Sequence, residues 1–165
     1  TVREFELTEV FLEAELRELL ANGIRLHVIG RRERLPENVQ KALAAAVRDT
    51  RQNSALQLNL ALSYGGRDEI TRAAQSLAAE VQAGRMRPAD ITEERLSARL
   101  DTAGIPDPDL LIRTGGDMRV SNFLLWQLAY TEIFVTPTLW PDFTPELFKQ
   151  ILTDFQSRER RFGRV

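Results

Sequence analysis

Residue types suited to phosphate binding gather in the run Arg113-Thr114-Gly115-Gly116-Asp117-Met118-Arg119-Val120-Ser121. Guanidinium groups such as those of Arg113 and Arg119 donate paired, charge-assisted hydrogen bonds to phosphate oxygens. The glycines let the backbone approach a ligand, and Ser121 stands where a helix is expected to begin, whose first amides would add donors. The sequence therefore indicates a phosphate site. The alternative is an ordinary glycine turn with a capping serine and solvated arginines.

Glu132 is a second candidate, because this carboxylate stands at the edge of a hydrophobic stretch, between Tyr130 and Ile133-Phe134. A carboxylate in apolar surroundings must be hydrogen-bonded, paired or bound to a cation. Magnesium prefers one or two carboxylates together with substrate phosphates. Beside an arginine-bound diphosphate, Glu132 would complete such a site. The alternative is an ion pair with one of the many arginines.

The remaining motifs carry less chemistry. The run Tyr64-Gly65-Gly66-Arg67-Asp68-Glu69 lacks the lysine and Ser/Thr of a Walker loop, so we expect it to be mainly structural. His27 is the only histidine and the chain has no cysteine, which excludes a multi-histidine metal site and thiolate chemistry. We expect His27 to be a packing residue of a strand.

Composition sets the class of protein. With 24 acidic and 22 basic side chains the formal net charge is -2, so no global positive field attracts nucleic acid. The 43% hydrophobic content of 165 residues suffices for one sizeable core, and we expect a single domain over residues 1–165. No stretch approaches the roughly 20 apolar residues of a membrane span, and residues 1–6 lack the layout of a signal peptide.

Hydrophobic spacing predicts alternating helices and strands. Asp90 with Glu93 resembles a capping box, and Thr144-Pro145 is a good helix start. Alternation of this kind indicates an α/β fold, a parallel sheet flanked by helices, with ligands at the carboxyl ends of strands. The loops after Leu62 and Ile112 are therefore the expected site. The expected helices cover residues 4–20, 36–51, 68–81, 90–100 and 144 onward, and the expected strands 24–29, 56–62, 110–112 and 133–135.

Several separate blocks, in order, resemble the cis-prenyltransferase family, whose bacterial type is undecaprenyl diphosphate synthase. The blocks are residues 63–70, 111–127, 129–132, 140–143 and 160–163. The resemblance implies a parallel α/β fold, a homodimer and a magnesium-dependent reaction. In that reaction isopentenyl diphosphate adds in cis to an allylic diphosphate, such as farnesyl diphosphate, giving a polyprenyl diphosphate. It also implies a cytoplasmic protein, which the lipid product, a cell wall lipid carrier, would bring to the inner face of the membrane.

The same resemblance assigns roles residue by residue. It places Arg113, Arg119 and Ser121, with the backbone at Val120, on the phosphates of isopentenyl diphosphate, and it assigns Glu132 to magnesium. Two carboxyl-terminal residues, Arg161 and Gly163, resemble an element that reaches the neighbouring active site of the dimer. One departure is Met118, which stands where some bacterial members have a histidine.

A second departure concerns the amino terminus. The family's amino-terminal block, whose aspartate binds magnesium, has no counterpart in the sequence, which corresponds to the carboxyl-terminal two thirds of a family member. The catalytic aspartate would lie in that absent block, so we expect the given chain alone to be inactive. The alternatives are a non-catalytic partner subunit of a heteromeric prenyltransferase, an inactive fragment that only binds a diphosphate, or a binding module for another phosphorylated ligand.

Overall fold

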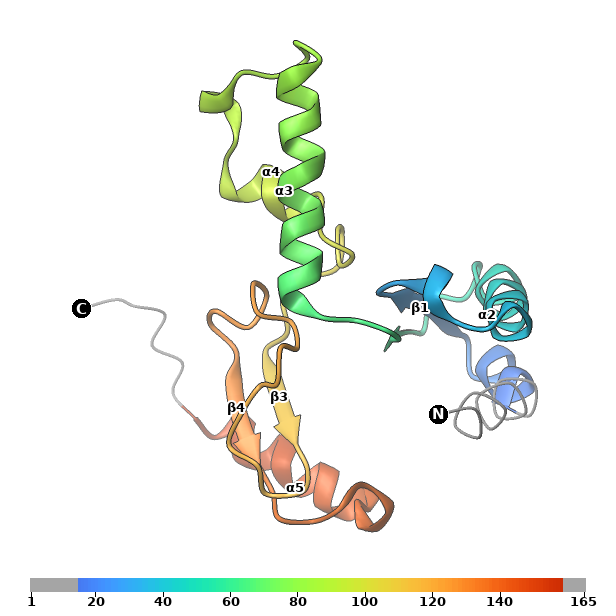
Figure 1. The fold of residues 1–165 in the computed structure, drawn as a ribbon. Coiled ribbons are helices and arrows are strands. Elements are labelled where there is room, and N and C mark those ends of the chain that lie inside the picture. The colour runs from blue at the N-terminus through green and yellow to red at the C-terminus, as the bar shows by residue number, and fades with distance from the viewer. Residues whose placement is uncertain (1–14, 159–165) are drawn as a thin grey trace. The chain divides into compact units, whose positions relative to one another are not determined.

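The chain divides into two compact units, Thr1–Ala103 and Gly104–Val165, and the computed structural model describes residues 15–158 of it (Figure 1). Whether the two units form the single expected domain stays a prediction. The helices and strands are β1 (Ile24–Ile29), α2 (Glu37–Asp49), β2 (Leu56–Ala61), α3 (Gly66–Gln82), α4 (Glu93–Ser97), β3 (Leu110–Arg113), β4 (Glu132–Val135) and α5 (Pro145–Gln156). Short 3-10 helices cover Arg32–Arg34, Pro88–Asp90 and Trp140–Asp142.

The strands pair in parallel, as the alternation of elements predicted, but the described strands form two two-stranded sheets, one in each unit, where a single sheet was expected. In the first unit β1 lies beside β2, with Ile24 opposite Leu56. In the second unit β3 lies beside β4, with Leu110 opposite Glu132. The connections between the paired strands run through α2 in the first unit and through a long turn segment in the second.

The core of the first unit lies between β1 and α2. Side chains alternate along a strand, so Leu26 and Val28 of β1 point to the same side, and both are buried. The buried residues of α2, which include Val39 and Leu43, recur every three or four positions and pack against them. The helix of residues 15–21 adds Leu19 to this cluster.

Two predicted helix starts are wrong. α4 is capped by Thr92, whose side chain accepts a hydrogen bond from the Arg95 amide at 3.3 Å, and not by Asp90. Asp90 is instead the last residue of the preceding 3-10 helix. Its side chain accepts a hydrogen bond, at 3.0 Å, from the amide of Arg87, which caps the start of that helix. The helix expected to begin at Ser121 is absent.

The segment of residues 121–130 forms consecutive turns. Ser121, Asn122 and Leu124 have φ values of 48°, 63° and 46°, which a right-handed helix does not allow. The start of α5 is confirmed: Thr144 caps it, accepting from the Leu147 amide at 3.2 Å.

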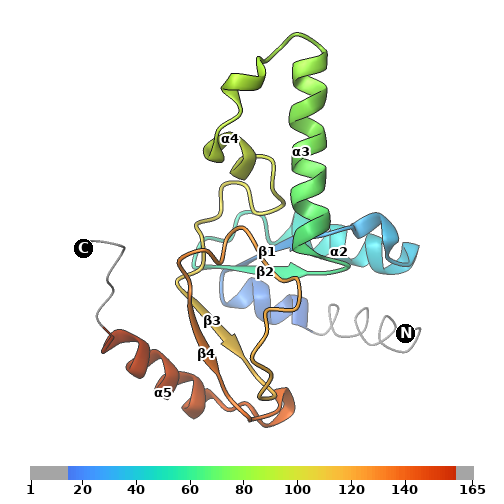
Figure 2. The ribbon, with the colours of Figure 1, turned by 60° about the vertical axis from the view of Figure 1, so that its left-hand side comes forward.

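Figure 2 shows α4 beside α3 in the first unit. Within residues 15–158 no helix has the length and apolarity to cross a bilayer.

Candidate active site

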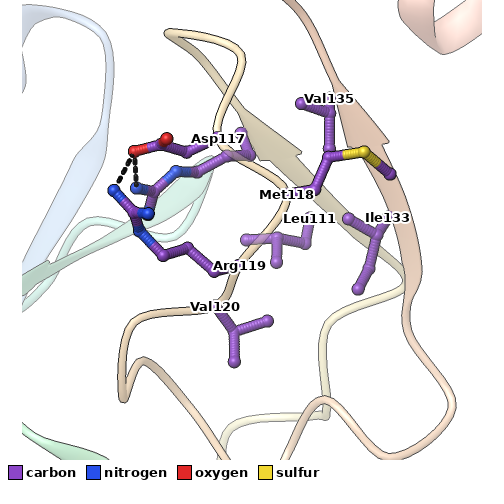
Figure 3. A pocket seen from close by; sticks show the side chains of 8 residues that line it. Leu111, Asp117, Met118, Arg119, Val120, Ile133 and Val135 are labelled. Atoms are coloured by element: carbon purple, nitrogen blue, oxygen red, sulfur yellow. Dashed lines mark hydrogen bonds and ion pairs between the residues drawn. The ribbon is translucent and has the colours of Figure 1, made fainter.

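A cavity of about 330 Å³ opens beside β3 in the second unit, and Figure 3 shows its side chains. It is formed by β3, β4 and the loop that follows β3. The loop after Ile112, predicted as a ligand site from the strand pattern, therefore borders a cavity. The lining residues are Leu111, Arg113, Asp117, Met118, Arg119, Val120, Ile133 and Val135.

One wall of the cavity is apolar because of the pleat of the strands. The register places Leu111 opposite Ile133 and Arg113 opposite Val135. Side chains two residues apart share a face of a strand, so these four side chains lie on one face of the strand pair. Three of them are aliphatic, and the fourth is the arginine at the carboxyl end of β3. The wall is thus suited to a short hydrocarbon joined to an anion.

The charged side of the cavity consists of two arginines and one carboxylate. The Nη2 atoms of Arg113 and Arg119 both donate to the same oxygen, Oδ2, of Asp117, at 3.4 and 2.5 Å (Figure 3). The three side chains are 31%, 67% and 44% exposed, so an anion from solvent can reach them. Among the residues that line the cavity, two cations share one carboxylate, which is one positive charge more than the negative charge. Sequence reasoning missed Asp117, although its position between the two arginines was a signal.

The two glycines of this loop serve a turn. Gly115 and Gly116 have φ values of 83° and 78°, in the left-handed region that glycine adopts without strain. Their amides donate to the carbonyl oxygens of Thr138 and Thr136, both at 2.9 Å. These amides are therefore used within the protein, and the guanidinium groups of Arg113 and Arg119 are the charged donors that line the cavity. The turn interpretation holds for the glycines, and the phosphate-binding role of the arginines stays a prediction.

The other predicted phosphate contacts are only partly brought together. Val120 lines the cavity and Ser121 does not. Ser121 is exposed, and because no helix begins there, the expected amides of a helix start are also missing. Met118, 89% exposed, contributes a thioether to the rim where the resemblance suggested a histidine. Arg161 and Gly163 lie outside the described residues, so their predicted roles stay predictions.

Glu132 lies away from the cavity. It is the first residue of β4, three residues before the level of Arg113, which corresponds to about 10 Å along the strand. Alternation also points it to the face opposite that of Ile133, which lines the cavity. Its Oε2 accepts a hydrogen bond from Arg158 Nη1 at 3.1 Å. The structure thus shows the ion pair that was the alternative to a magnesium ligand.

The described residues do not by themselves fit a magnesium site. Within residues 15–158 no group of three or more histidine, aspartate or glutamate side chains could hold a metal ion. The carboxylate of the cavity, Asp117, is bonded to two guanidinium groups, whose charge opposes a cation.

His27 lies in β1 of the first unit, and its buried Nδ1 has no hydrogen-bond partner in the described structure.

A second charge cluster follows β1 in the first unit. Arg31 donates to both carboxylate oxygens of Asp68, at 2.9 and 2.8 Å. Arg72 donates to Asp68 at 2.9 Å and to both oxygens of Asp101, at 2.8 and 2.7 Å. Asp101 also accepts from the Gly30 amide at 3.0 Å. We call the four side chains of Arg31, Asp68, Arg72 and Asp101 the four-charge network.

The network stabilises the charged form of each member. The guanidinium of Arg31, followed by that of Arg72, holds the pKa of Asp68 well below its usual range. Arg72 likewise lowers the pKa of Asp101, and Asp101 raises that of Arg72. Each arginine has a bidentate carboxylate of its own, so the network has no unmatched cation.

The loop before α3 joins the same network, in agreement with the prediction that residues 64–69 are mainly structural. The Tyr64 hydroxyl donates to Glu69 Oε2 at 2.5 Å. Glu69 is 1% exposed, and its other oxygen accepts from the Asp101 amide at 2.8 Å. These contacts tie α3 to the loop that carries Asp101. The buried Glu69 side chain is thus hydrogen-bonded, as buried polar groups generally are.

Comparison with known proteins places the chain in a family. The family described as "Putative undecaprenyl diphosphate synthase", a prenyltransferase family, matches residues 3–163. An isoprenyl transferase of Geobacillus kaustophilus is 49% identical over 160 residues, which are 97% of this chain and 62% of that protein. An isoprenyl transferase of Porphyromonas gingivalis is 51% identical over 151 residues, 92% of this chain and 59% of that protein. The chain thus spans less than two thirds of these relatives.

Solved structures confirm the α/β fold. Lavandulyl diphosphate synthase from Lavandula x intermedia, in complex with dimethylallyl diphosphate, matches with a TM-score of 0.93 and 40% identity, over 97% of this chain and 70% of that one. A probable undecaprenyl diphosphate synthase from Campylobacter jejuni matches with a TM-score of 0.84 and 40% identity, over 97% and 73%. The cavity, the fold and these matches agree: the chain belongs to the undecaprenyl diphosphate synthase family of prenyltransferases.

Proposed function

We propose that the protein to which this chain belongs condenses isopentenyl diphosphate with an allylic diphosphate, such as farnesyl diphosphate, to give a cis-polyprenyl diphosphate. The observation that carries the proposal is the two-sided cavity of the second unit. Its wall of Leu111, Ile133 and Val135 suits a five-carbon hydrocarbon, and its two arginines suit a diphosphate. Isopentenyl diphosphate has these two parts at this scale.

The chemistry needs little covalent participation from the protein. The carbon–oxygen bond of the allylic diphosphate breaks, diphosphate departs, and the double bond of isopentenyl diphosphate forms a carbon–carbon bond with the allylic carbon. The isopentenyl unit then loses a proton. Arg113 and Arg119 would hold its diphosphate, and the apolar wall would keep water from the reacting carbons. The contribution of these residues is positioning and charge stabilisation.

Several finer assignments belong to the proposal. Ser121 and the backbone at Val120 would complete the phosphate contacts. A homodimer would bring Arg161 and Gly163 of one subunit to the other subunit's site. A divalent cation, magnesium, would be required, with Glu132 as the family ligand. Because the described residues form no metal cluster, substrate oxygens and groups outside residues 15–158 would have to supply most of its coordination. We also expect a cytoplasmic protein that meets the inner face of the membrane through its lipid product.

Calorimetric titration of isopentenyl diphosphate into the 165-residue chain tests the site directly. We expect saturable binding that is weakened strongly in Arg113→Ala and absent with isopentenyl alcohol, which lacks the diphosphate. Radiolabelled isopentenyl diphosphate with farnesyl diphosphate then tests turnover. Failure to bind isopentenyl diphosphate, together with binding of another phosphate ester, would contradict the proposal and favour a different phosphorylated ligand.

Turnover separates the remaining alternatives. A non-catalytic partner subunit would bind isopentenyl diphosphate and give no product alone, yet would raise the activity of a catalytic relative added to it. An inactive fragment would bind and raise no activity. The expected result for the given chain alone is binding without product, since the family's aspartate motif is not in its sequence. Product formation appears, under the proposal, when the chain is tested within the complete protein.

A further inference from the structure

Asp117 accepts hydrogen bonds from the guanidinium groups that a substrate diphosphate would need as donors. Its Oδ2 accepts from Arg113 and Arg119, and it is the only carboxylate among the eight residues that line the cavity. Guanidinium N–H groups that donate to a carboxylate are the same groups that donate to phosphate oxygens. A diphosphate cannot engage both arginines fully while Asp117 keeps them.

We propose that Asp117 is an exchangeable counter-ion, which competes with the diphosphate of isopentenyl diphosphate for Arg113 and Arg119. The inference rests on the proposed function. Asp117 holds two like charges close together, since it accepts from both guanidinium groups. When the diphosphate enters, its oxygens take the guanidinium donors, and the carboxylate turns toward solvent, which its 44% exposure permits.

The geometry is that of an exchangeable contact. Asp117 uses one oxygen for both arginines, and its distance to Arg113 is 3.4 Å. In the four-charge network, by contrast, Asp101 uses both oxygens toward Arg72, at 2.8 and 2.7 Å. A single-oxygen, exposed ion pair is weak, and a diphosphate carries more negative charge than one carboxylate. The diphosphate therefore displaces Asp117, at some loss of affinity.

The same competition helps the product to leave. In the proposed condensation the new carbon–carbon bond joins the chain to the isopentenyl unit, so the product keeps the diphosphate that Arg113 and Arg119 bind. This head group must leave the arginines before another isopentenyl diphosphate binds. A carboxylate that returns to the guanidinium groups lowers the free energy of the vacated site. Asp117 is thus a positioning residue that sets both affinity and release.

Asp117→Asn tests the proposal, because it removes the charge at nearly constant shape. We expect the Kd for isopentenyl diphosphate, measured by calorimetry on the 165-residue chain, to fall about twofold to fivefold, as for loss of a nearby exposed like charge. The dissociation rate in stopped-flow displacement by inorganic diphosphate should fall with it. In complete protein that turns over, KM and kcat should both decrease. Loss of a merely structural residue would raise KM.

Two matched variants complete the experiment. Asp117→Glu keeps a carboxylate and should restore the Kd of the unaltered chain. Asp90→Asn removes another arginine-paired aspartate, one that does not line the cavity, and should leave the Kd unchanged. Circular dichroism checks folding, and Asp117→Ser replaces Asp117→Asn if the latter does not fold.

The outcomes separate this inference from the proposed function. Normal binding by the unaltered chain with equal or weaker binding by Asp117→Asn would overturn the counter-ion role and leave the proposed function standing. No binding of isopentenyl diphosphate by the unaltered chain would overturn the proposed function, and this inference with it.

Discussion

In the first unit Arg72 donates to both oxygens of Asp101, whereas in the second unit Arg113 and Arg119 share one oxygen of Asp117. The Arg72 and Asp101 side chains are 29% and 16% exposed. Asp117 and Arg119 are 44% and 67% exposed. The same two side-chain types thus form a saturated, sheltered contact in one unit and an unsaturated, accessible contact in the other.

The two contacts differ in how completely each guanidinium is paired. In the four-charge network each guanidinium has its own bidentate carboxylate, so an added anion would gain few donors and break existing bonds. In the cavity the arginines outnumber the carboxylate, and the space beside them is about 330 Å³. A surplus of cations next to a cavity indicates an anion site better than the number of arginines does.

Replacement of the cavity arginines should produce the largest effect. Arg113→Ala and Arg119→Ala each remove a diphosphate donor, and we expect a higher KM for isopentenyl diphosphate and a lower kcat. Each should cost about 2 to 4 kcal/mol of transition-state binding in kcat/KM. Steady-state kinetics of the complete enzyme measures this. Unchanged kinetics in both variants would remove the assigned site.

Breaking the sheltered contact should instead reduce stability. Asp101→Ala removes the acceptor of the Gly30 amide and leaves Arg72 with its contact to Asp68 alone, and we expect a loss of about 2 kcal/mol in the free energy of unfolding. Asp117→Ala, the matched change in the cavity, should cost about 0.5 kcal/mol or less, because the pair is exposed. Urea unfolding of both variants compares them. Equal losses would contradict the distinction between the two units.

Acid should destabilise the first unit by protonating the carboxylates of the four-charge network. The pKa values of Asp68 and Asp101 are lowered in the folded protein by Arg31 and Arg72, whereas an unfolded aspartate has a pKa of about 3.9. Their contribution is therefore complete above the unfolded pKa and is lost as pH falls below about 4 toward the folded values. Unfolding measured between pH 7 and 3 should show this loss. In Asp101→Ala the pH dependence should be shallower, and an identical slope would count against the network.

The smallest effect on stability is expected at Glu132. Glu132→Gln weakens an ion pair with Arg158 whose members are 25% and 44% exposed, so the free energy of unfolding should change by about 0.5 kcal/mol or less. Turnover of the complete enzyme at several magnesium concentrations is the informative measurement. A marked loss of activity that excess magnesium relieves would support the family role of Glu132. Unaltered activity would show that the ion pair is its whole role.

Local patterns predicted most elements because their signals are contained in a few neighbouring residues. The alternation of β1, the three- and four-residue spacing of α2 and the Thr144 cap of α5 needed no distant contact. The two failures have different causes. At Asp90 two local capping residues competed, and Thr92 caps α4 instead. At Ser121, Asn122 and Leu124 the backbone has positive φ values, which local preference does not predict, in place of the expected helix.

Residue type and spacing along the chain were enough to predict the class of fold and the family, and they singled out Arg113 and Arg119 as candidates, which the structure places beside a cavity. The contacts of Asp117 with both arginines depend on the conformation of the loop after β3, which residue types did not reveal. The position of Glu132, on the face away from the arginines, depends on strand register. Which residues of β3 and β4 stand opposite one another depends on how two strands, separated by 18 residues, come together. That pairing sets the face and the end of the sheet on which each side chain lies.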